Sequence, residues 1–471
     1  MGDGVTDDLD AIIKAHEFAN LMGYKVCANQ GATYYIGGSG RTAEIQTDTD
    51  WGNAKFIIDN TQMEDRTRRV FRVTSKLPSI NLEKIITTLK KNQKKLNLTF
   101  PHDSFVIVLD ETTMRFFRPG TTQAEGSPQV DVFVIDRNGN VDPNNPIIWD
   151  YDNISSIIAY PIEEETLTIS GGYFSTIANL VLRSNVARGI MISRSNVIVD
   201  GLNHVVTGET SDSAPASGIL NISSCANVLI QNSTFFGRLR SESSYDINVS
   251  RSTNVTFKNC KQANSIHDTN RWGIFGSNEC KNLIFDTVEF SRFDAHRGVT
   301  NATIKNSSIG HHGIQLIGFG TFLIEDSKLY GSNIITFRSD YGSTFNGDVI
   351  IRNCEFTPRN NRTRAEVTLI GGSNTGDNYF GYTCYMPRRI IIDGLKIIDL
   401  HTPDGYQGPR LFASFNSANT SASHVDSYPI VVTEEVIINN LTIESGQPLI
   451  VSINQYMFRN VRVIGYNNIV R

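Results

Sequence analysis

The sequence predicts an all-β chain folded as a right-handed parallel β-helix, with an N-terminal capping helix and loop insertions. The main observation is a short phrase that recurs between residues 177 and 463: an apolar residue, any residue, then a small turn-forming residue, usually with another apolar residue three positions on. Most copies lie about 20 to 28 residues apart, as expected when each repeat forms one structural unit. The turn-forming position is occupied by Asn179, Gly201, Asn232, Asn259, Thr287, Asn306, Asp326, Asn353, Gly394, Asn440 and Asn460.

The residue types at this position indicate one-residue bends between short strands. Asparagine, aspartate and glycine enter the left-handed backbone region most easily, and the flanking alternations rich in Ile, Val and Phe are typical of strands. A one-residue bend cannot reverse the chain as a hairpin turn does, so the strands are expected to coil and to stack about 4.8 Å apart. The alternative, a sandwich or barrel of hairpins, would require Asn-Gly or Asp-Gly pairs between the strands.

The N-terminal stretch predicts a helix that covers one end of the coil. Thr6, Asp7 or Asp8 can cap this helix, an apolar stripe follows at helical spacing, and Gly23 ends it. Two strands are expected next, at 24–28 and 33–38. A covering helix hides the unpaired strand edges that an open coil would expose. We therefore expect an N-terminal cap at 1–60, early coils with an insertion at 61–170, and regular coils at 171–471.

The segment between the cap and the repeat has weaker patterns. Residues 82–97 carry apolar residues at helical spacing followed by a basic run, which favours a solvated amphipathic helix over a binding patch for an anionic polymer. Residues 131–142 alternate like a strand and contain Asn138-Gly139, which predicts a hairpin. Farther on, long insertions near 360–388 and 401–433 could form the wall of a groove or an intersubunit surface.

The opening phrase GDGVTDD, with its helix, Gly turn and TYYI strand, resembles the start of the pectate-lyase-like right-handed β-helix proteins of phage tailspikes. Residues 102–142 resemble an insertion common in tail fibres and appendages of phages of Gram-positive bacteria, and together with the repeat and the opening phrase they make the chain most similar to the preneck appendage proteins of small Bacillus phages. The resemblance implies a homotrimeric virion appendage that acts at the host cell surface on a glycopolymer, either teichoic acid or a polysaccharide. It also implies contacts with other neck and tail proteins through anchoring and assembly segments outside these 471 residues.

Composition and charge exclude several other classes of function. The net charge of −5 gives no electrostatic support for a nucleic-acid partner. No apolar run is long enough for membrane insertion. The cysteines at 225, 260, 280 and 354 occupy equivalent repeat positions, which indicates buried core residues rather than disulfides or metal ligands. No cofactor is predicted, and a divalent metal has no support in the spacing of its possible ligands.

Polar side chains that are unusual for a coil interior gather in the middle of the repeat. We align five neighbouring strands on the apolar residue that ends each of the triplets 245–247, 272–274, 297–299, 312–314 and 332–334. This register predicts that Trp272, Arg297 and His312 stack on one another. It predicts the same for Arg271, His296 and His311. The candidate catalytic residues are His296, His311, Asp268 and Asp294. The candidate substrate-binding residues are Arg271, Trp272, Arg297, His312, Gln315, Arg338, Asp340 and Tyr245.

These residue types suit the cleavage of a phosphodiester-linked glycopolymer. Arginine binds phosphate oxygens with two parallel hydrogen bonds, histidine transfers protons near neutral pH, and a carboxylate can orient or activate that histidine. Trp272 and Tyr245 could stack on sugar or glycerol faces. Four alternatives stay open: a non-enzymatic adhesin, a glycosidase that uses two carboxylates on a capsular polysaccharide, a structural spacer, and a polar face that is simply solvated.

Overall fold

The computed structural model describes residues 1–180, 185–239, 244–359, 366–400 and 403–471. The repeat phrase at 177–182 and the insertions near 360–388 and 401–433 therefore lie partly outside the described residues. The chain forms two compact units. Unit 1 comprises Met1–Leu109, Val130–Gly276 and Val288–Ser291, and unit 2 comprises Asp110–Gln129, Ser277–Thr287 and Arg292–Arg471.

Unit 1 contains the predicted helix, α1 (Leu9–Met22), close to its N-terminus. Asp7 accepts a hydrogen bond from the backbone N–H of Leu9 at 3.0 Å, and Gly23 ends the helix in the left-handed conformation. The buried face includes Ile13 and His16, and the His16 ring packs edge-on against Phe71 with ring centroids 6.3 Å apart. The capping helix predicted from sequence is thus present.

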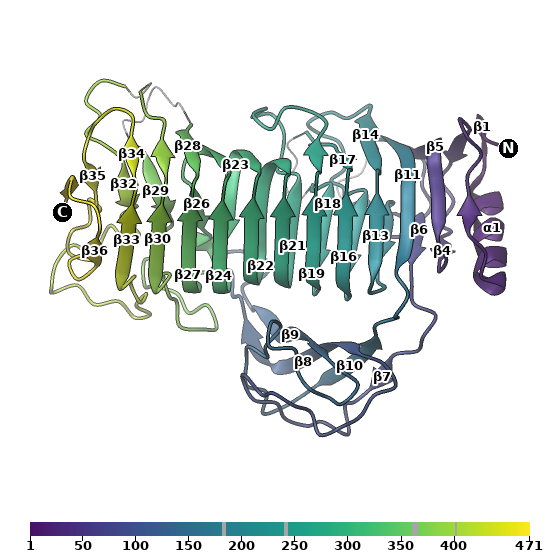
Figure 1. Ribbon diagram of the computed structural model, residues 1–471, viewed down its shortest axis with the longest axis horizontal. Helices are drawn as coiled ribbons and strands as arrows, with labels where there is room; N and C mark the ends of the chain where they lie inside the picture. Colours follow the sequence, from purple (N-terminus) through teal and green to yellow (C-terminus); the bar gives the residue numbers. More distant parts are fainter. Residues whose placement is uncertain (181–184, 240–243, 360–365, 401–402) are drawn as a thin grey trace. The chain divides into compact units, whose positions relative to one another are not determined.

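Three parallel ladders of strands follow in unit 1, and Figure 1 shows β11, β13, β16 and β19 as neighbouring parallel arrows. The first ladder pairs β2, β5, β11, β13, β16 and β19 in that order. The second pairs β1, β3, β5, β11, β14, β17 and β20. The third pairs β4, β6, β12, β15 and β18. The strands are β1 (Asp3–Asp7), β2 (Val26–Cys27), β3 (Thr33–Ile36), β4 (Ala43–Ile45), β5 (Thr49–Asp59), β6 (Phe71–Val73), β11 (Leu167–Ile177), β12 (Ile190–Ile192), β13 (Val197–Asp200), β14 (Asn203–Thr207), β15 (Leu220–Ser223), β16 (Ala226–Gln231), β17 (Thr234–Phe235), β18 (Ile247–Ser250), β19 (Thr253–Lys258) and β20 (Lys261–Gln262).

Unit 2 has the same arrangement of three parallel ladders. Figure 1 shows β24, β27, β30 and β33 side by side. The first ladder pairs β21, β22, β24, β27, β30, β33 and β36. The second pairs β23, β25, β28, β31 and β34, and the third pairs β23, β26, β29, β32, β35 and β37. The elements are β21 (Phe275–Asp286), β22 (Glu289–Lys305), β23 (Ser308–Leu316), β24 (Gly318–Glu325), β25 (Lys328–Gly331), β26 (Ile335–Phe337), η1 (Ser339–Tyr341), β27 (Phe345–Arg352), β28 (Glu355–Pro358), β29 (Thr368–Gly371), β30 (Arg389–Asp393), β31 (Lys396–Ile397), β32 (Arg410–Phe412), β33 (Glu435–Asn439), β34 (Thr442–Ile443), β35 (Leu449–Ile450), β36 (Arg462–Ile464) and β37 (Ile469–Val470).

The bends predicted between the strands are largely confirmed. Nine of the eleven predicted residues have φ between 48° and 79°. The prediction is wrong for Asn179 and Asn460, which do not have a positive φ. Asn179 instead donates a buried hydrogen bond from its side chain to the backbone oxygen of Asn60 at 2.8 Å, and Asn460 lies in a turn. The fold is therefore the predicted parallel β-helix, in which successive coils add strands to three parallel ladders.

The insertion contains an antiparallel sheet of four strands, in the order β7-β10-β8-β9. Its strands are β7 (Ile80–Asn81), β8 (Ser104–Arg115), β9 (Ser127–Ile135) and β10 (Ser156–Pro161). The hairpin prediction is confirmed, because Ile135 and Val141 form an antiparallel bridge around the turn at Gly139. The core of this sheet in unit 1 includes Leu82, Leu89 and Phe133.

The amphipathic helix predicted for residues 82–97 is wrong. Leu89 exchanges two backbone hydrogen bonds with Tyr151, at 2.8 and 2.9 Å, and Lys95 forms a bridge with Asn140. The backbone of this segment therefore pairs with a distant segment rather than with its own next turn. The apolar residues that suggested a helical stripe instead contribute to the core of the antiparallel sheet. In the described parts of the chain, no helix has the length and apolar character needed to cross a membrane.

Candidate functional site

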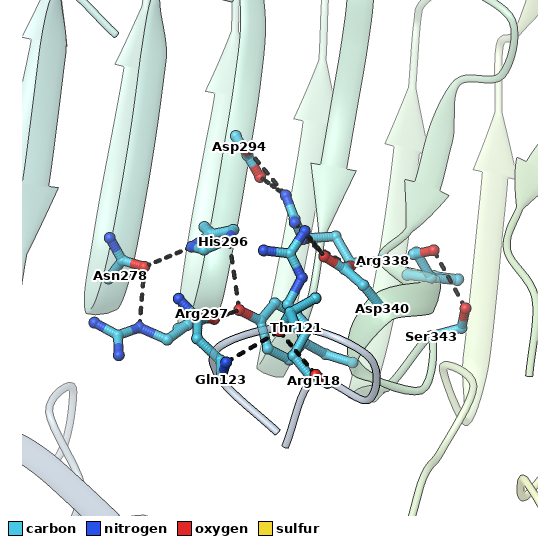
Figure 2. A network of polar contacts seen from close by, with 12 residues as sticks. Arg118, Thr121, Gln123, Asn278, Asp294, His296, Arg297, Arg338, Asp340 and Ser343 are labelled. Atoms are coloured by element: carbon cyan, nitrogen blue, oxygen red, sulfur yellow. Dashed lines mark hydrogen bonds and ion pairs between the residues drawn. The ribbon is translucent and has the colours of Figure 1, made fainter. Parts of the chain in front are cut away.

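A β-bulge in β22 brings two polar side chains to the same acceptor. Ser277 of β21 pairs with Ala295, and the next residue, Asn278, pairs with Arg297, so His296 is the extra residue of the bulge. The Oδ1 atom of Asn278 lies 3.0 Å from His296 Nδ1 and accepts a hydrogen bond from Arg297 Nε at 3.2 Å (Figure 2). Without the extra residue, the alternation of a strand would point His296 and Arg297 to opposite faces.

The bulge also fixes the protonation of His296. Since Asn278 Oδ1 accepts hydrogen bonds, Nδ1 of His296 carries the proton and the lone pair is on Nε2, which lies 3.5 Å from the hydroxyl of Tyr341. Burial lowers the pKa of His296 to about 4, and the positive charge of Arg338 adds to this effect. His296 is thus neutral near pH 7, with one nitrogen able to accept a proton.

Tyr341 connects this histidine to the loop between β8 and β9. Its hydroxyl donates a hydrogen bond to Gln123 Oε1 at 2.8 Å, and its ring packs edge-on against His296 at 5.5 Å. The guanidinium groups of Arg338 and Arg118 lie 5.6 and 5.8 Å from the ring centroid. Burial raises the pKa of Tyr341, so the phenol keeps its proton at neutral pH.

Two aspartates hold the arginines in place. Asp294 is fully buried between Arg338, whose Nη1 lies 2.9 Å from Oδ1, and Arg292, whose Nη2 lies 2.7 Å from Oδ2. Asp340 binds Arg338 through two hydrogen bonds of 2.6 and 3.2 Å and forms an ion pair with Arg118 at 3.0 Å. Although burial opposes its charge, the carboxylates of Asp294 and Asp340 raise the pKa of Arg338.

We refer to these residues of unit 2 as the arginine–histidine cluster. It consists of Arg118, Gln123, Asn278, Arg292, Asp294, His296, Arg297, Arg338, Asp340 and Tyr341. Arg118 and Arg297 expose 32% and 26% of their side chains, whereas Arg292 and Arg338 expose 9% and 10%. The side chains of Arg118 and Arg297 are therefore partly exposed to solvent, while those of Arg292 and Arg338 are largely buried.

Five of the residues predicted from sequence belong to this cluster: Asp294, His296, Arg297, Arg338 and Asp340 (Figure 2). The other three of unit 2 are His311, His312 and Gln315, which Figure 2 does not label. His311 and His312 are neighbours on β23 with ring centroids 4.0 Å apart. Gln315 pairs across the sheet with Thr336.

Four predicted residues belong to unit 1. Arg271 forms an ion pair with Asp268 at 3.0 Å and lies 3.9 Å from Glu209. The rings of Tyr245 and Trp272 are tilted against each other with centroids 6.2 Å apart.

The strand register that suggested these stacks is wrong in unit 2. The alignment placed Val299 opposite Ile314, whereas Val299 pairs with Cys280 and Gly318. Ile314 pairs with Ile335, one residue beyond the residue chosen in the alignment. The error arises because Val299 lies in β22, in the first ladder, whereas Ile314 lies in β23 and belongs to the third ladder, so the apolar anchor does not mark the same ladder in neighbouring coils.

Several members of the cluster were missed at the sequence level: Arg118, Gln123, Asn278, Arg292 and Tyr341. Arg118 and Gln123 come from a loop that precedes β22 (Glu289–Lys305) by a long stretch of sequence, so no local pattern reveals them. The sequence did contain a signal near Asn278, because this residue lies four positions before the bend residue Asn282, whose φ is 50°. Within the described ranges, no three His, Cys, Asp or Glu residues are grouped in a way that could hold a metal ion.

Comparison with known proteins bears on the fold. No protein-family model matches the chain, and no curated protein matches it in sequence. The structure is similar to the tailspike of Pseudomonas phage phi297, with 13% identity over 93% of this chain and 76% of that one, and a TM-score of 0.57. It is also similar to the tailspike of Pseudomonas phage LKA1, with 11% identity, coverage of 97% and 77%, and a TM-score of 0.55.

A third similar structure is the tailspike of Acinetobacter baumannii phage AP22, solved in complex with A. baumannii capsular saccharide. It is 10% identical over 98% of this chain and 77% of that one, with a TM-score of 0.53. At these identities the likeness concerns architecture. The chain has the parallel β-helix fold of phage tailspikes.

Proposed function

We propose that this chain is the β-helix part of a phage tail appendage that binds an anionic glycopolymer of the bacterial surface and hydrolyses its phosphodiester bonds. The observation that carries the proposal is the arginine–histidine cluster, in which two partly exposed guanidinium groups flank a neutral histidine of fixed tautomer. The tailspike fold supports the same assignment.

The finer identity rests on the sequence resemblance. The opening motif, residues 102–142 and the repeat together support a homotrimeric preneck appendage of a small Bacillus phage, with wall teichoic acid as its polymer and the virion as its location. The neck and tail proteins of that virion would be its further partners. The tailspike of phage AP22 binds a capsular saccharide, which keeps a polysaccharide as the second candidate substrate.

Arg118 and Arg297 are the proposed phosphate-binding residues. A guanidinium group matches phosphate oxygens with two parallel hydrogen bonds. Arg118 is anchored through Asp340, and Arg297 donates to Asn278 at 3.2 Å and to Ser127 at 3.0 Å. Both arginines are therefore oriented before a ligand arrives, which reduces the entropy lost on binding.

His296 is the proposed proton-transfer residue. Water attacks phosphorus and gives a proton to His296 Nε2, and the bond from phosphorus to the leaving oxygen breaks. His296 then passes this proton to the leaving oxygen and regains its starting state, while the fully buried Tyr341 packs against the ring and helps to hold it in place. The arginines stabilise the charge that develops on the phosphate oxygens.

The charge of the polymer would increase the basicity of His296. Its pKa of about 4 makes it a weak base at neutral pH in the free protein. A phosphate bound between Arg118 and Arg297 brings negative charge close to the ring and offsets the effect of Arg338. Polymer binding should therefore raise the pKa of His296 toward its operating range.

A glycosidase is less consistent with this cluster. Such an enzyme needs one protonated carboxyl group as general acid. Asp294 and Asp340 each bind two guanidinium groups, so both carboxylates are occupied by arginines of the cluster rather than open to a sugar. We assign Asp294 the role of holding Arg338 and Arg292.

The other predicted residues keep proposed roles as contacts. His311, His312 and Gln315 of unit 2 are proposed to bind the polymer. In unit 1 we propose the same for a second group: Arg271, Trp272 and Tyr245, with Asp268 as the partner of Arg271.

The test uses purified wall teichoic acid and, separately, capsular polysaccharide, with chain length and binding both measured. We expect the wild type to bind and shorten teichoic acid. We expect His296→Gln to bind it with similar affinity and to leave its length unchanged. Binding without shortening by the wild type would identify an adhesin and refute hydrolysis, while shortening of the polysaccharide alone would favour the second candidate substrate.

A further inference from the structure

A second polar site lies in the C-terminal part of unit 2. A pocket of about 450 Å³ is lined by Asn416, Asn419, His424, Asp426, Thr433 and Arg459, among others. Its volume falls within the range of about 300–1,000 Å³ that is usual for small-molecule sites. Most of these residues come from the long insertion that precedes β33.

The polar groups of this pocket are held in fixed positions. Asp426 is nine-tenths buried and accepts hydrogen bonds from Asn416 Nδ2 at 2.9 Å and from Asn419 Nδ2 at 3.3 Å. His424 Nε2 lies 2.8 Å from the same carboxylate. Among the described residues, the buried hydroxyl of Thr433 and the Oδ1 atom of Asn419 have no hydrogen-bond partner. The pocket thus offers both donors and acceptors that a ligand could satisfy.

A row of aromatic rings leads from the arginine–histidine cluster toward this pocket. Phe117 immediately precedes Arg118 of the cluster in sequence, and its ring centroid lies 5.6 Å from that of Tyr379. Tyr379 lies 5.6 Å from Tyr428, which is two residues beyond Asp426. Tyr379 and Tyr428 expose 53% and 46% of their surface.

The first ring of this row is fixed by two glycines. A Cβ atom at Gly126 would lie 3.1 Å from the Phe117 ring, and one at Gly381 would lie 3.0 Å from it. Both glycines have positive φ, of 78° and 87°. Because glycine has no Cβ atom, both positions leave room for the Phe117 ring.

We infer that the pocket binds a neutral sugar unit of the same polymer whose phosphate is bound by the arginine–histidine cluster. The inference rests on the proposed function and deepens it. Hydroxyl groups of a sugar match the mixed donors and acceptors around Asp426, and Pro429 and Ile430 offer apolar contacts. The exposed rings of Tyr379 and Tyr428 could stack on the apolar faces of sugar rings between the cluster and the pocket, because a tyrosine ring has a flat apolar face and a polar hydroxyl.

The test compares two probes: purified wall teichoic acid that carries sugar substituents, and the same preparation after the sugars have been removed. We expect the wild type to bind the glycosylated polymer about tenfold more tightly. Tyr379→Ala and His424→Ala should each reduce this preference about threefold to tenfold, with unchanged binding of the sugar-free polymer.

Two matched controls should keep the full preference. Val425→Ala alters an 86% exposed neighbour of His424. Tyr24→Ala removes an exposed tyrosine that also packs on an aromatic ring, Phe18 at 5.9 Å, but lies in unit 1. The inference alone is overturned if the wild type binds both polymers equally, or if Tyr379→Ala and His424→Ala both fold and keep the full preference for the glycosylated polymer. Binding of neither polymer overturns the proposed function and the inference with it.

Discussion

Replacing His296 with glutamine should make the protein less sensitive to acid. The pKa of His296 is about 4 in the folded protein, against an ordinary value of 6.5. Between these values the unfolded chain binds a proton that the folded chain does not, so the free energy of unfolding falls as the pH falls from 6.5 to 4. The difference of about 2.5 pKa units corresponds to roughly 3 kcal/mol at about 1.4 kcal/mol per unit. Glutamine does not titrate, and its amide can still donate to Asn278.

The assay is denaturant unfolding followed by circular dichroism at a series of pH values between neutrality and pH 4. The wild type should lose about 3 kcal/mol more stability over this range than His296→Gln. His16→Gln is the matched control, since it replaces a histidine of unit 1 whose pKa burial also lowers to about 4 and should therefore reduce the acid sensitivity in the same way. The reasoning is refuted if wild type and His296→Gln lose the same stability, or if the His296 ring titrates near its ordinary pKa by NMR.

Three further changes follow from the structure. Asp294→Asn should lower the free energy of unfolding by about 3–5 kcal/mol, because it leaves Arg338 and Arg292 buried without their shared carboxylate. Asp340→Asn should lower it clearly less, because Asp340 is 28% exposed. Equal losses of both variants in denaturant unfolding would contradict this. Arg297→Gln should weaken binding to teichoic acid and make it less sensitive to salt, measured by calorimetry at several salt concentrations; an unchanged salt dependence would show that Arg297 does not contact the polymer's charge. Thr287→Asn should raise the free energy of unfolding by about 1 kcal/mol, because a β-branched residue is strained at φ 59°, and a loss of stability would show that the hydrogen bond from Thr287 to Asp286 matters more.

The repeat could be predicted from sequence because its cause is local. A bend residue must enter the left-handed region, and few residue types do so readily, so Asn232, Asn259 and Asn353 can be recognised one by one. Equivalent asparagines of neighbouring coils hydrogen-bond to each other, as where Asn259 donates to Asn232 at 3.3 Å. A second row of bends was missed, in which Asn254 donates to Asn227 and Asn227 to Asn196, each at 3.0 Å.

The site was harder to predict because it depends on register and on distant segments. A single extra residue, His296, shifts the pairing of β22 and changes which side chains are neighbours. Arg118 and Gln123 reach the cluster from the insertion, where the sequence predicted a hairpin and a helix but gave no signal for these two residues. The residue types in the cluster were therefore predicted in part, while the contacts among them were not.

The most direct test of the central claim is the phosphorus NMR spectrum of purified wall teichoic acid incubated with the protein in water enriched in heavy oxygen. Hydrolysis through His296 predicts new phosphomonoester signals that carry the isotope shift of one heavy oxygen atom, with the wild type but not with His296→Gln. The absence of new phosphomonoesters with the wild type, or equal amounts with both proteins, would contradict it.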